Sequence, residues 1–298
     1  MRIGIDSYCF HRFFGEVYEG TQPPARPMTL DDLLAFAKEL GVDGVSLESC
    51  FLPSMEASWL RELGAKLDGY GLERVYAWGH PFGLEDGTNR EAFDDMLQQI
   101  GNAALIGARV MRVTPGPGPS DFRAVPRHPR LEVVARWYAE AVDVARHHDI
   151  RLAAENHGDY TADEMLWIVE AVGSPYFGVT FDTGNFLFVG DDPVEAMEKL
   201  ARHTFATHIK DPAVDVRVRK GLPPSKWSFL SSTAVGEGLV DMERVLQLLA
   251  QAGYTGLLAV EIDRVHPDYE NKEELAVRKS VEALRRMVGN ITETARPA

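Results

Sequence analysis

The sequence has little cysteine and no long apolar run. Its two cysteines, Cys9 and Cys50, are too few for the disulfide framework of a small secreted protein, and we expect two unpaired, buried thiols. No apolar run reaches the roughly 18 residues that a membrane span needs. The N-terminus leads directly into a strand-like pattern without a basic region or a cleavage site. We therefore expect a cytoplasmic protein with no membrane partner.

Clustered positive charge is also lacking. The formal net charge is −14, and no sustained run of lysine or arginine occurs. Binding to a nucleic-acid backbone needs clustered cations, so we expect no nucleic-acid partner. A small polar substrate is compatible with this charge, and a negative surface field would concentrate divalent cations.

Short apolar runs alternate with stretches of helical periodicity along all 298 residues, without a break in composition. This alternation favours one (β/α)8 barrel domain over residues 1–298, and a doubly wound sheet is the alternative. Helix starts are predicted after Thr29, Thr161 and Asn271, each followed three residues later by an acidic side chain. The segment at about 211–240 is unusually long for a connection between a strand and a helix. Eight strands are predicted, at 2–9, 43–49, 73–79, 108–114, 150–155, 176–182, 204–209 and 256–262.

Four of these predicted strands end in an unusual way. A single acidic or imidazole side chain closes each apolar run, and the four side chains are Glu155, Asp182, His208 and Glu261. The first three are separated by the length of one strand and helix, and the fourth by one such unit lengthened by the long segment. The C-terminal ends of neighbouring barrel strands meet at one rim, so we expect the four side chains to face a common point.

The chemistry of these four side chains predicts a divalent cation between them. Three carboxylates in a small volume repel each other strongly unless a cation neutralises them. Three oxygen ligands and one imidazole form a mostly hard donor set, which suits Mn²⁺, Mg²⁺ or Co²⁺ better than structural zinc. Each residue alone is as readily a helix cap or a solvated loop residue, but the four together favour a metal site.

Two further side chains lie just beyond these strand ends. His157 is two residues past Glu155, and the period of a strand directs both to the same side. It is expected to be a general acid or base, or else a loop residue that hydrogen-bonds its neighbours. Lys210 follows His208 by two residues, where it contacts a substrate hydroxyl or carboxylate, or else lies on the surface.

The earlier strands and the long segment offer candidates for the rest of a substrate pocket. Glu48 and His80 stand near the ends of the second and third predicted strands, with His80 favoured as a hydroxyl contact. The long segment brings Trp227 and several cations near the rim. It is interpreted either as a lid over the substrate or as a solvated charged loop.

The motifs AENHGDYT, FDTGN, GDDPVEA, HIKD, GEGLVD and VEID, all within 151–263, resemble those of a known family. This is the sugar phosphate isomerase/epimerase family of xylose-isomerase-like TIM barrels. The resemblance implies a small-molecule sugar substrate and a divalent metal, commonly manganese. The implied ligands are the Glu of AENH, the Asp of FDTGN, the His of HIKD and the Glu of VEID, which are the four residues already singled out. We therefore expect Mn²⁺ first, with Mg²⁺ or Co²⁺ as alternatives.

The resemblance also implies catalytic roles. In ketose epimerases of this family the two strand-end glutamates act as base and acid, so Glu155 and Glu261 take those roles here. Asn185 stands where some ketose epimerases carry a substrate-binding histidine, so a different substrate pose is expected. A metal held by neighbouring carbonyl and hydroxyl oxygens acidifies the carbon between them. We therefore expect an isomerase or epimerase that abstracts a proton next to a ketone.

Other functions stay open at this point. The Glu-x-His arrangement of residues 155–157 also resembles the metal subunit of C-glycoside deglycosidases, which predicts a lyase of 3-keto glycosides. In that case a hetero-oligomer is expected, whereas an isomerase is compatible with a homo-oligomer. A non-catalytic sugar-binding subunit is the alternative from another class. No glycine-rich phosphate loop stands out, so the sequence leaves open whether the sugar is phosphorylated.

Overall fold

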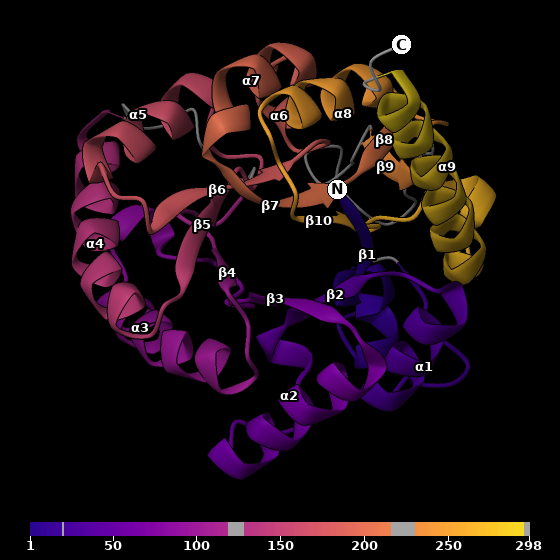
Figure 1. Ribbon diagram of the computed structural model, residues 1–298, viewed down its shortest axis with the longest axis horizontal. Helices are drawn as coiled ribbons and strands as arrows, with labels where there is room; N and C mark the ends of the chain where they lie inside the picture. The colour runs from indigo at the N-terminus through magenta and orange to yellow at the C-terminus, as the bar shows by residue number, and fades with distance from the viewer. Residues whose placement is uncertain (20, 119–127, 216–229, 295–298) are drawn as a thin grey trace.

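Eight parallel strands form a closed barrel in the computed structural model, which describes residues 1–19, 21–118, 128–215 and 230–294 (Figure 1). Around the barrel the strands follow the order β1-β10-β7-β6-β5-β4-β3-β2, so the predicted single-domain (β/α)8 barrel is confirmed. The predicted strands are all present, with ends that differ by a few residues. Their bounds are β1 (Arg2–Asp6), β2 (Gly44–Glu48), β3 (Glu73–Ala77), β4 (Val110–Val113), β5 (Arg151–Glu155), β6 (Phe177–Asp182), β7 (Thr204–Ile209) and β10 (Leu257–Val260).

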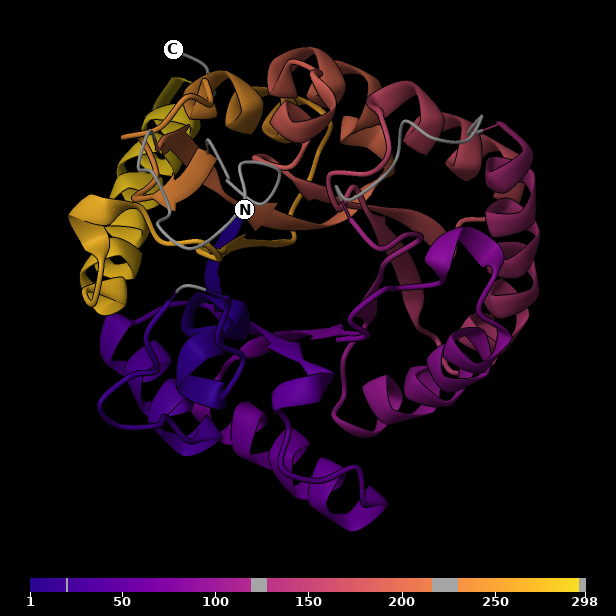
Figure 2. The ribbon, with the colours of Figure 1, turned by 180° about the vertical axis from the view of Figure 1, so that it is seen from behind.

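Helices surround the barrel on its outside in both views (Figure 1, Figure 2). No helix among the described residues is long and apolar enough to cross a membrane. Short 3-10 helices lie in the connections between the longer elements, namely η1 (Ser7–Phe14), η2 (Ser49–Phe51), η3 (Glu85–Gly87), η4 (Ala201–His203) and η6 (Pro267–Tyr269). The α-helices are α1 (Leu30–Leu40), α2 (Ala57–Tyr70), α3 (Arg90–Leu105), α4 (His128–His147), α5 (Ala162–Val172), α6 (Phe186–Val189), α7 (Pro193–Leu200), α8 (Met242–Gln251) and α9 (Glu273–Thr294).

Helix capping follows the sequence signals at two of three predicted starts. Thr29 and Thr161 each form a capping box with the acidic residue three positions later, at the starts of α1 and α5. The prediction for Asn271 is wrong, because α9 begins at Glu273 and Asn271 has a φ of 60° in the turn before it. Asparagine tolerates this left-handed conformation better than most residues, so it serves the turn rather than the helix.

The long segment after β7 contains regular structure at both ends. β8 (Asp211–Val214) pairs antiparallel with β9 (Leu230–Thr233) in a separate two-stranded sheet. The expectation of one long irregular loop is therefore corrected for its two ends. Trp227 and the middle of the proposed lid, residues 216–229, lie outside the described residues.

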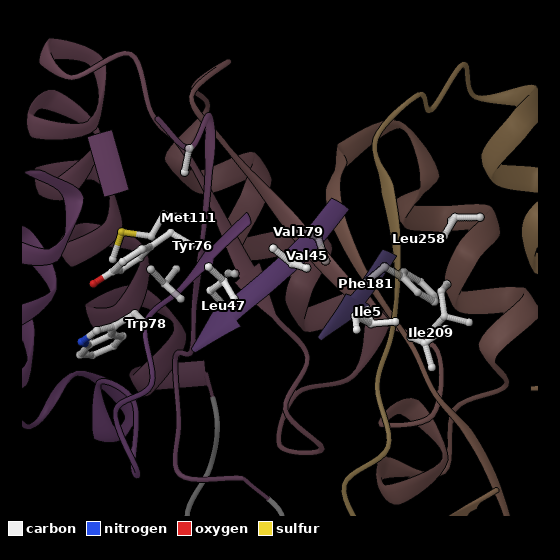
Figure 3. Packing of buried hydrophobic residues seen from close by; sticks show 14 of the residues in the cluster. Ile5, Val45, Leu47, Tyr76, Trp78, Met111, Val179, Phe181, Ile209 and Leu258 are labelled. Carbon is white, nitrogen blue, oxygen red and sulfur yellow. The ribbon is translucent and has the colours of Figure 1, made fainter. Parts of the chain in front are cut away.

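Alternation along the strands separates the outer core from the interior of the barrel. Ile5, Val45, Val179, Phe181 and Leu258 are buried in one large apolar cluster together with residues of the helices (Figure 3). The residues between them point the other way, into the barrel, where successive positions face opposite sides of a strand. Polar side chains at the strand ends are therefore directed to a shared interior.

The two cysteines are unpaired, as expected, but they differ in burial. Cys9 is buried in η1, and its thiol donates to the Val260 carbonyl oxygen over 3.2 Å. Cys50 is exposed, which corrects the expectation of two buried thiols. It lies in η2, beyond the last residue of β2, where the chain has left the barrel wall.

Candidate metal centre

Four side chains converge at the C-terminal end of the barrel, each offering one ligand atom within 4.8 Å of the others. They belong to neighbouring strands: two end β5 and β6, one lies in β7, and one directly follows β10. Each is at most 5% exposed. They are Glu155, Asp182, His208 and Glu261, the residues that the strand-end pattern singles out. Their role as metal ligands stays a prediction.

The polar atoms of this four-residue cluster fit a shared cation. Among the described residues, Glu155 Oε2, Asp182 Oδ2 and Glu261 Oε2 accept no well-aligned hydrogen bond. His208 Nδ1 lies 3.1 Å from Glu155 Oε1 and 3.4 Å from Glu261 Oε2, so it faces the carboxylates. Buried carboxylate oxygens without well-aligned donors are costly, and a cation at their centre would remove that cost.

Electrostatics in the cluster point the same way. Burial disfavours the charged imidazole of His208, but the adjacent Glu261 and Glu155 raise its pKa well above the usual value. Burial also raises the pKa of Asp182 well above its usual range, with Lys210 opposing. Burial opposes ionisation of Glu155 too, yet Arg112 and His208 outweigh it and lower its pKa. The buried carboxylates of the cluster thus favour positively charged groups next to them.

Lys210 is one of these positively charged groups. It is not the surface residue that the sequence also allowed. It is buried, and its Nζ lies 3.0 Å from Asp182 Oδ2 and 2.9 Å from Glu261 Oε2. It also donates to Asp263 Oδ2 and to Asn185 Oδ1, each over 3.2 Å. Burial disfavours its charge, but Asp182 and Asp263 raise its pKa well above the usual value. An ammonium therefore stands at the edge of the cluster.

Arg112 is a second cation at the cluster, and sequence reasoning missed it. Its guanidinium is paired with Glu48, and its Nε lies 3.1 Å from Glu155 Oε2. A further N–H donates to the Trp78 carbonyl oxygen over 3.1 Å. Glu48 is therefore buried against Arg112 inside the barrel. A substrate that contacts Glu48, as predicted, would have to compete with Arg112 for its carboxylate. Burial raises the pKa of Glu48 and Arg112 opposes the rise.

Asp6 is another residue that sequence reasoning missed. It is fully buried at the end of β1, and its Oδ2 lies 3.4 Å from His208 Nε2. Its Oδ1 accepts from the Tyr8 backbone N–H over 2.6 Å, which holds the carboxylate in place. A carboxylate on the far nitrogen of a ligating histidine fixes the ring orientation. The placement leaves Nδ1 of His208 facing the cluster.

Two asparagines organise the ends of β5 and β6. Asn156 accepts from the Asp182 backbone N–H over 2.9 Å and donates to its carbonyl oxygen over 3.0 Å. Asp182 Oδ1 accepts from the backbone N–H groups of Gly184 and Asn185, so Oδ2 is left for the cluster. The Asn185 amide also lies 3.5 Å from Glu155 Oε1. Asn185 is thus part of the network around the cluster, and its contact with a substrate stays a prediction.

The two remaining candidates are half-buried histidines. His157 Nδ1 makes no hydrogen bond to any residue in the described ranges. Burial lowers the pKa of His157, with Arg112 and Lys210 adding to the effect and Glu155 opposing it, which favours a neutral ring. His80 stacks on Trp78 with ring centroids 5.1 Å apart and lies outside the four-residue cluster.

Comparison with known proteins places the chain in a family. The model of the xylose isomerase-like TIM barrel family matches residues 34–287. The chain belongs to this family. The rhizopine catabolism protein MocC of Rhizobium meliloti is 28% identical over 256 residues, covering 76% of this chain and 77% of that protein. Inosose dehydratase of Serratia proteamaculans is 26% identical over 233 residues, covering 71% of this chain and 76% of that protein.

Solved structures share the fold. L-ribulose 3-epimerase superimposes with a TM-score of 0.72 and 16% identity, covering 99% of this chain and 96% of that chain. The D-psicose 3-epimerase of Clostridium cellulolyticum H10, solved with D-tagatose, gives 0.73 and 15%, covering 96% and 99%. The IOLI protein with a zinc atom gives 0.72 and 14%, covering both chains completely. At these identities the likeness supports the barrel alone.

Proposed function

We propose that this protein is a metal-dependent isomerase or epimerase that removes a proton next to the ketone of a ketose or keto sugar. The observation that carries the proposal is the convergence of Glu155, Asp182, His208 and Glu261 within 4.8 Å. Membership of a family whose relatives include inosose dehydratases, and whose fold is shared with ketose epimerases, supports an enzyme acting on small polyhydroxylated molecules.

The donor set also supports a choice of metal. Three carboxylates and one imidazole would hold Mn²⁺, with Mg²⁺ or Co²⁺ as alternatives, and one structural neighbour carries zinc. When bound, a divalent cation supplies Lewis acidity that acidifies the carbon between a carbonyl and a hydroxyl group. Asp6 orients His208 for this purpose, and Asn156 together with the turn after β6 orients Asp182.

Proton transfer is assigned to the two glutamates. Glu155 and Glu261 come from β5 and from the end of β10, so they approach the interior from different parts of the wall. One carboxylate takes the proton, and the other returns one to the opposite side of the resulting enediolate, which inverts the carbon. Lys210, in contact with Glu261, is assigned the binding of a substrate hydroxyl in this proposal.

Elimination is a second candidate, and the surroundings of the bases favour it. Arg112 lowers the pKa of Glu155, which weakens it as a base, and Lys210 already engages Glu261. His157, by contrast, has an Nδ1 that no described residue hydrogen-bonds. A neutral imidazole beside the cluster is suited to take the proton while a neighbouring group leaves. The substrate would then be an inosose or a 3-keto glycoside, and the enzyme a lyase.

Solvent deuterium exchange tests both candidates. The protein with Mn²⁺ is incubated in D₂O with ketoses, inososes and 3-keto glycosides, and the products are analysed by NMR and mass spectrometry. Exchange at one carbon with recovery of an epimer supports the epimerase, and loss of water or of an aglycone supports the lyase. If metal binds but no compound exchanges, proton abstraction is refuted and a sugar-binding subunit is favoured.

Two variants distinguish the bases. Glu261→Gln should abolish epimerisation, and exposed Glu282→Gln is its matched control. His157→Asn should abolish elimination, with exposed His148→Asn as its control. A Glu261→Gln enzyme that epimerises at the wild-type rate would refute the two-glutamate scheme.

A further inference from the structure

A cavity of about 310 Å³ lies at the N-terminal end of the barrel, opposite the metal centre. The first residues of several strands line it, among them Arg2 of β1, Glu73 of β3 and Arg151 of β5. The cluster residues stand at the other ends of the strands. Along β5, Arg151 and Glu155 are four residues apart, which corresponds to about 13 Å. The cavity is therefore separate from the candidate metal centre.

Small and apolar residues explain why the cavity has a closed floor. Val75, Val110 and Leu257 form part of an apolar cluster inside the barrel and line the cavity. Leu257 lies over Gly4 and Gly44, where an added Cβ would be 2.7 Å and 2.9 Å from its Cδ1. Only glycine leaves room for this close approach, so the leucine covers the barrel interior above it. A ligand in the cavity would rest on this apolar floor.

The wall of the cavity is strongly cationic although the chain as a whole carries a net charge of −14. Glu73 is the acidic residue among those lining it, and it pairs with Arg2 at 2.7 Å. Arg74 pairs with Asp68 and Arg109 with Asp149. The arginines that line the cavity are Arg2, Arg74, Arg109, Arg151 and Arg202.

Two of these arginines have no acidic partner within the described ranges, Arg151 and Arg202. The Arg151 guanidinium lies over the Phe205 ring, 4.7 Å from its centroid. Stacking of this kind holds the planar group in position and leaves its N–H donors available. Arg202 lies in η4 and is exposed at the rim of the cavity. Two available guanidinium groups on an apolar floor are suited to a ligand with two negative charges.

We infer that this cavity binds a small phosphate-type dianion, either free phosphate or the phosphate group of a monoester, through Arg151 and Arg202. Guanidinium groups match phosphate oxygens with paired N–H donors, and charge-assisted bonds of this kind are the strong ones. The cavity is at the lower end of the size range of small-molecule sites, which fits a phosphate with a short organic group. The inference does not rest on the proposed catalytic function.

Binding of inorganic phosphate and of glucose 6-phosphate to the full-length protein tests this inference, with glucose as the uncharged control. Isothermal titration calorimetry at low salt and slightly alkaline pH should show saturable binding of one anion per chain and no binding of glucose. Tighter binding of glucose 6-phosphate identifies a monoester site, and equal or weaker binding identifies a free-phosphate site. Absence of saturable binding of both anions overturns the inference.

Variants locate the anion. Arg151→Gln and Arg202→Gln should each weaken binding about tenfold or more, because each removes a charge-assisted donor pair. Exposed Arg286→Gln makes the same charge change on α9 and should leave binding unchanged. Arg151 and Arg202 are both exposed, so neither substitution removes a buried contact and both variants should fold. Binding that survives both substitutions would place the anion outside this cavity and overturn the inference.

Discussion

The buried ammonium of Lys210 provides a sharp test of how the cluster balances its charge. This group lies within 3.2 Å of carboxylate oxygens of Asp182, Glu261 and Asp263. Lys210→Met keeps the length and the packing of the side chain but removes the positive charge. Removing one partner of a buried ion pair costs about 3–5 kcal/mol of folding free energy. The unfolding entropy is about 2.1 cal/mol/K per residue, so for a chain of 298 residues the loss corresponds to a fall in Tm of about 5–8 °C.

The same variant should respond more strongly than the wild type to Mn²⁺. A divalent cation neutralises the same carboxylates, so it replaces part of what the ammonium supplied. Without Lys210 the metal also no longer competes with an ammonium for Asp182 Oδ2 and Glu261 Oε2. We therefore expect Mn²⁺ to raise the Tm of Lys210→Met further than that of the wild type, and to bind more tightly in calorimetric titrations.

Differential scanning calorimetry with and without Mn²⁺ measures both effects. Lys199→Met is the matched control, because Lys199 pairs with Asp163 at 2.6 Å on the exposed surface. Exposed pairs contribute about 0–1 kcal/mol, so the control should change little and its response to Mn²⁺ should equal that of the wild type. The reasoning is refuted if Lys210→Met without metal has the same Tm as the control. It is also refuted if Mn²⁺ raises the Tm of the two variants by the same amount.

Three further predictions concern the support of the site and the core. Asp6→Asn should weaken Mn²⁺ binding about 10–100-fold in direct titration, because the carboxylate on His208 Nε2 is lost; unchanged affinity would exclude an orienting role. Burial, with Asp86 adding to it, raises the pKa of Asp159 to about 7, so stability is present at acidic pH and lost as pH rises from about 4 to 7. Asp159→Asn should therefore flatten the urea-unfolding free energy over this window, and an unchanged slope would contradict the assignment. Leu47→Ala should cost about 2–5 kcal/mol in the same assay, because Leu47 is buried in the main core, and a smaller loss would mean that the site collapses around the gap.

Strand-end chemistry could be predicted well because it depends on local patterns. An apolar run closed by one polar residue indicates both the strand and the side chain that it delivers to the rim. Asp6 carries the same signal at the end of β1, but the predicted strand of 2–9 ran past it. Strand ends are less certain than strands, and here an error of three residues hid a partner of His208.

Arg112 and Asp263 could not be recognised in the same way. Arg112 lies within β4, where a charged residue in an apolar run suggests an exposed position; only closure of the barrel makes its inward side the buried one. Asp263 follows β10, and its contact with Lys210 depends on the pairing of β10 with β7.

The sequence by itself determined the barrel, the order of its units and the four residues that close their strands, because periodicity and spacing are properties of the chain. Tertiary structure alone decided the ionic partners of those residues: Lys210 and Arg112 beside the carboxylates, Asp6 behind His208. It also decided that Arg151, at the start of β5, lines a separate cationic cavity. The physical reason is that charge balance depends on distance in space, and closing the barrel brings together residues from β1, β4 and β10 that no local pattern connects.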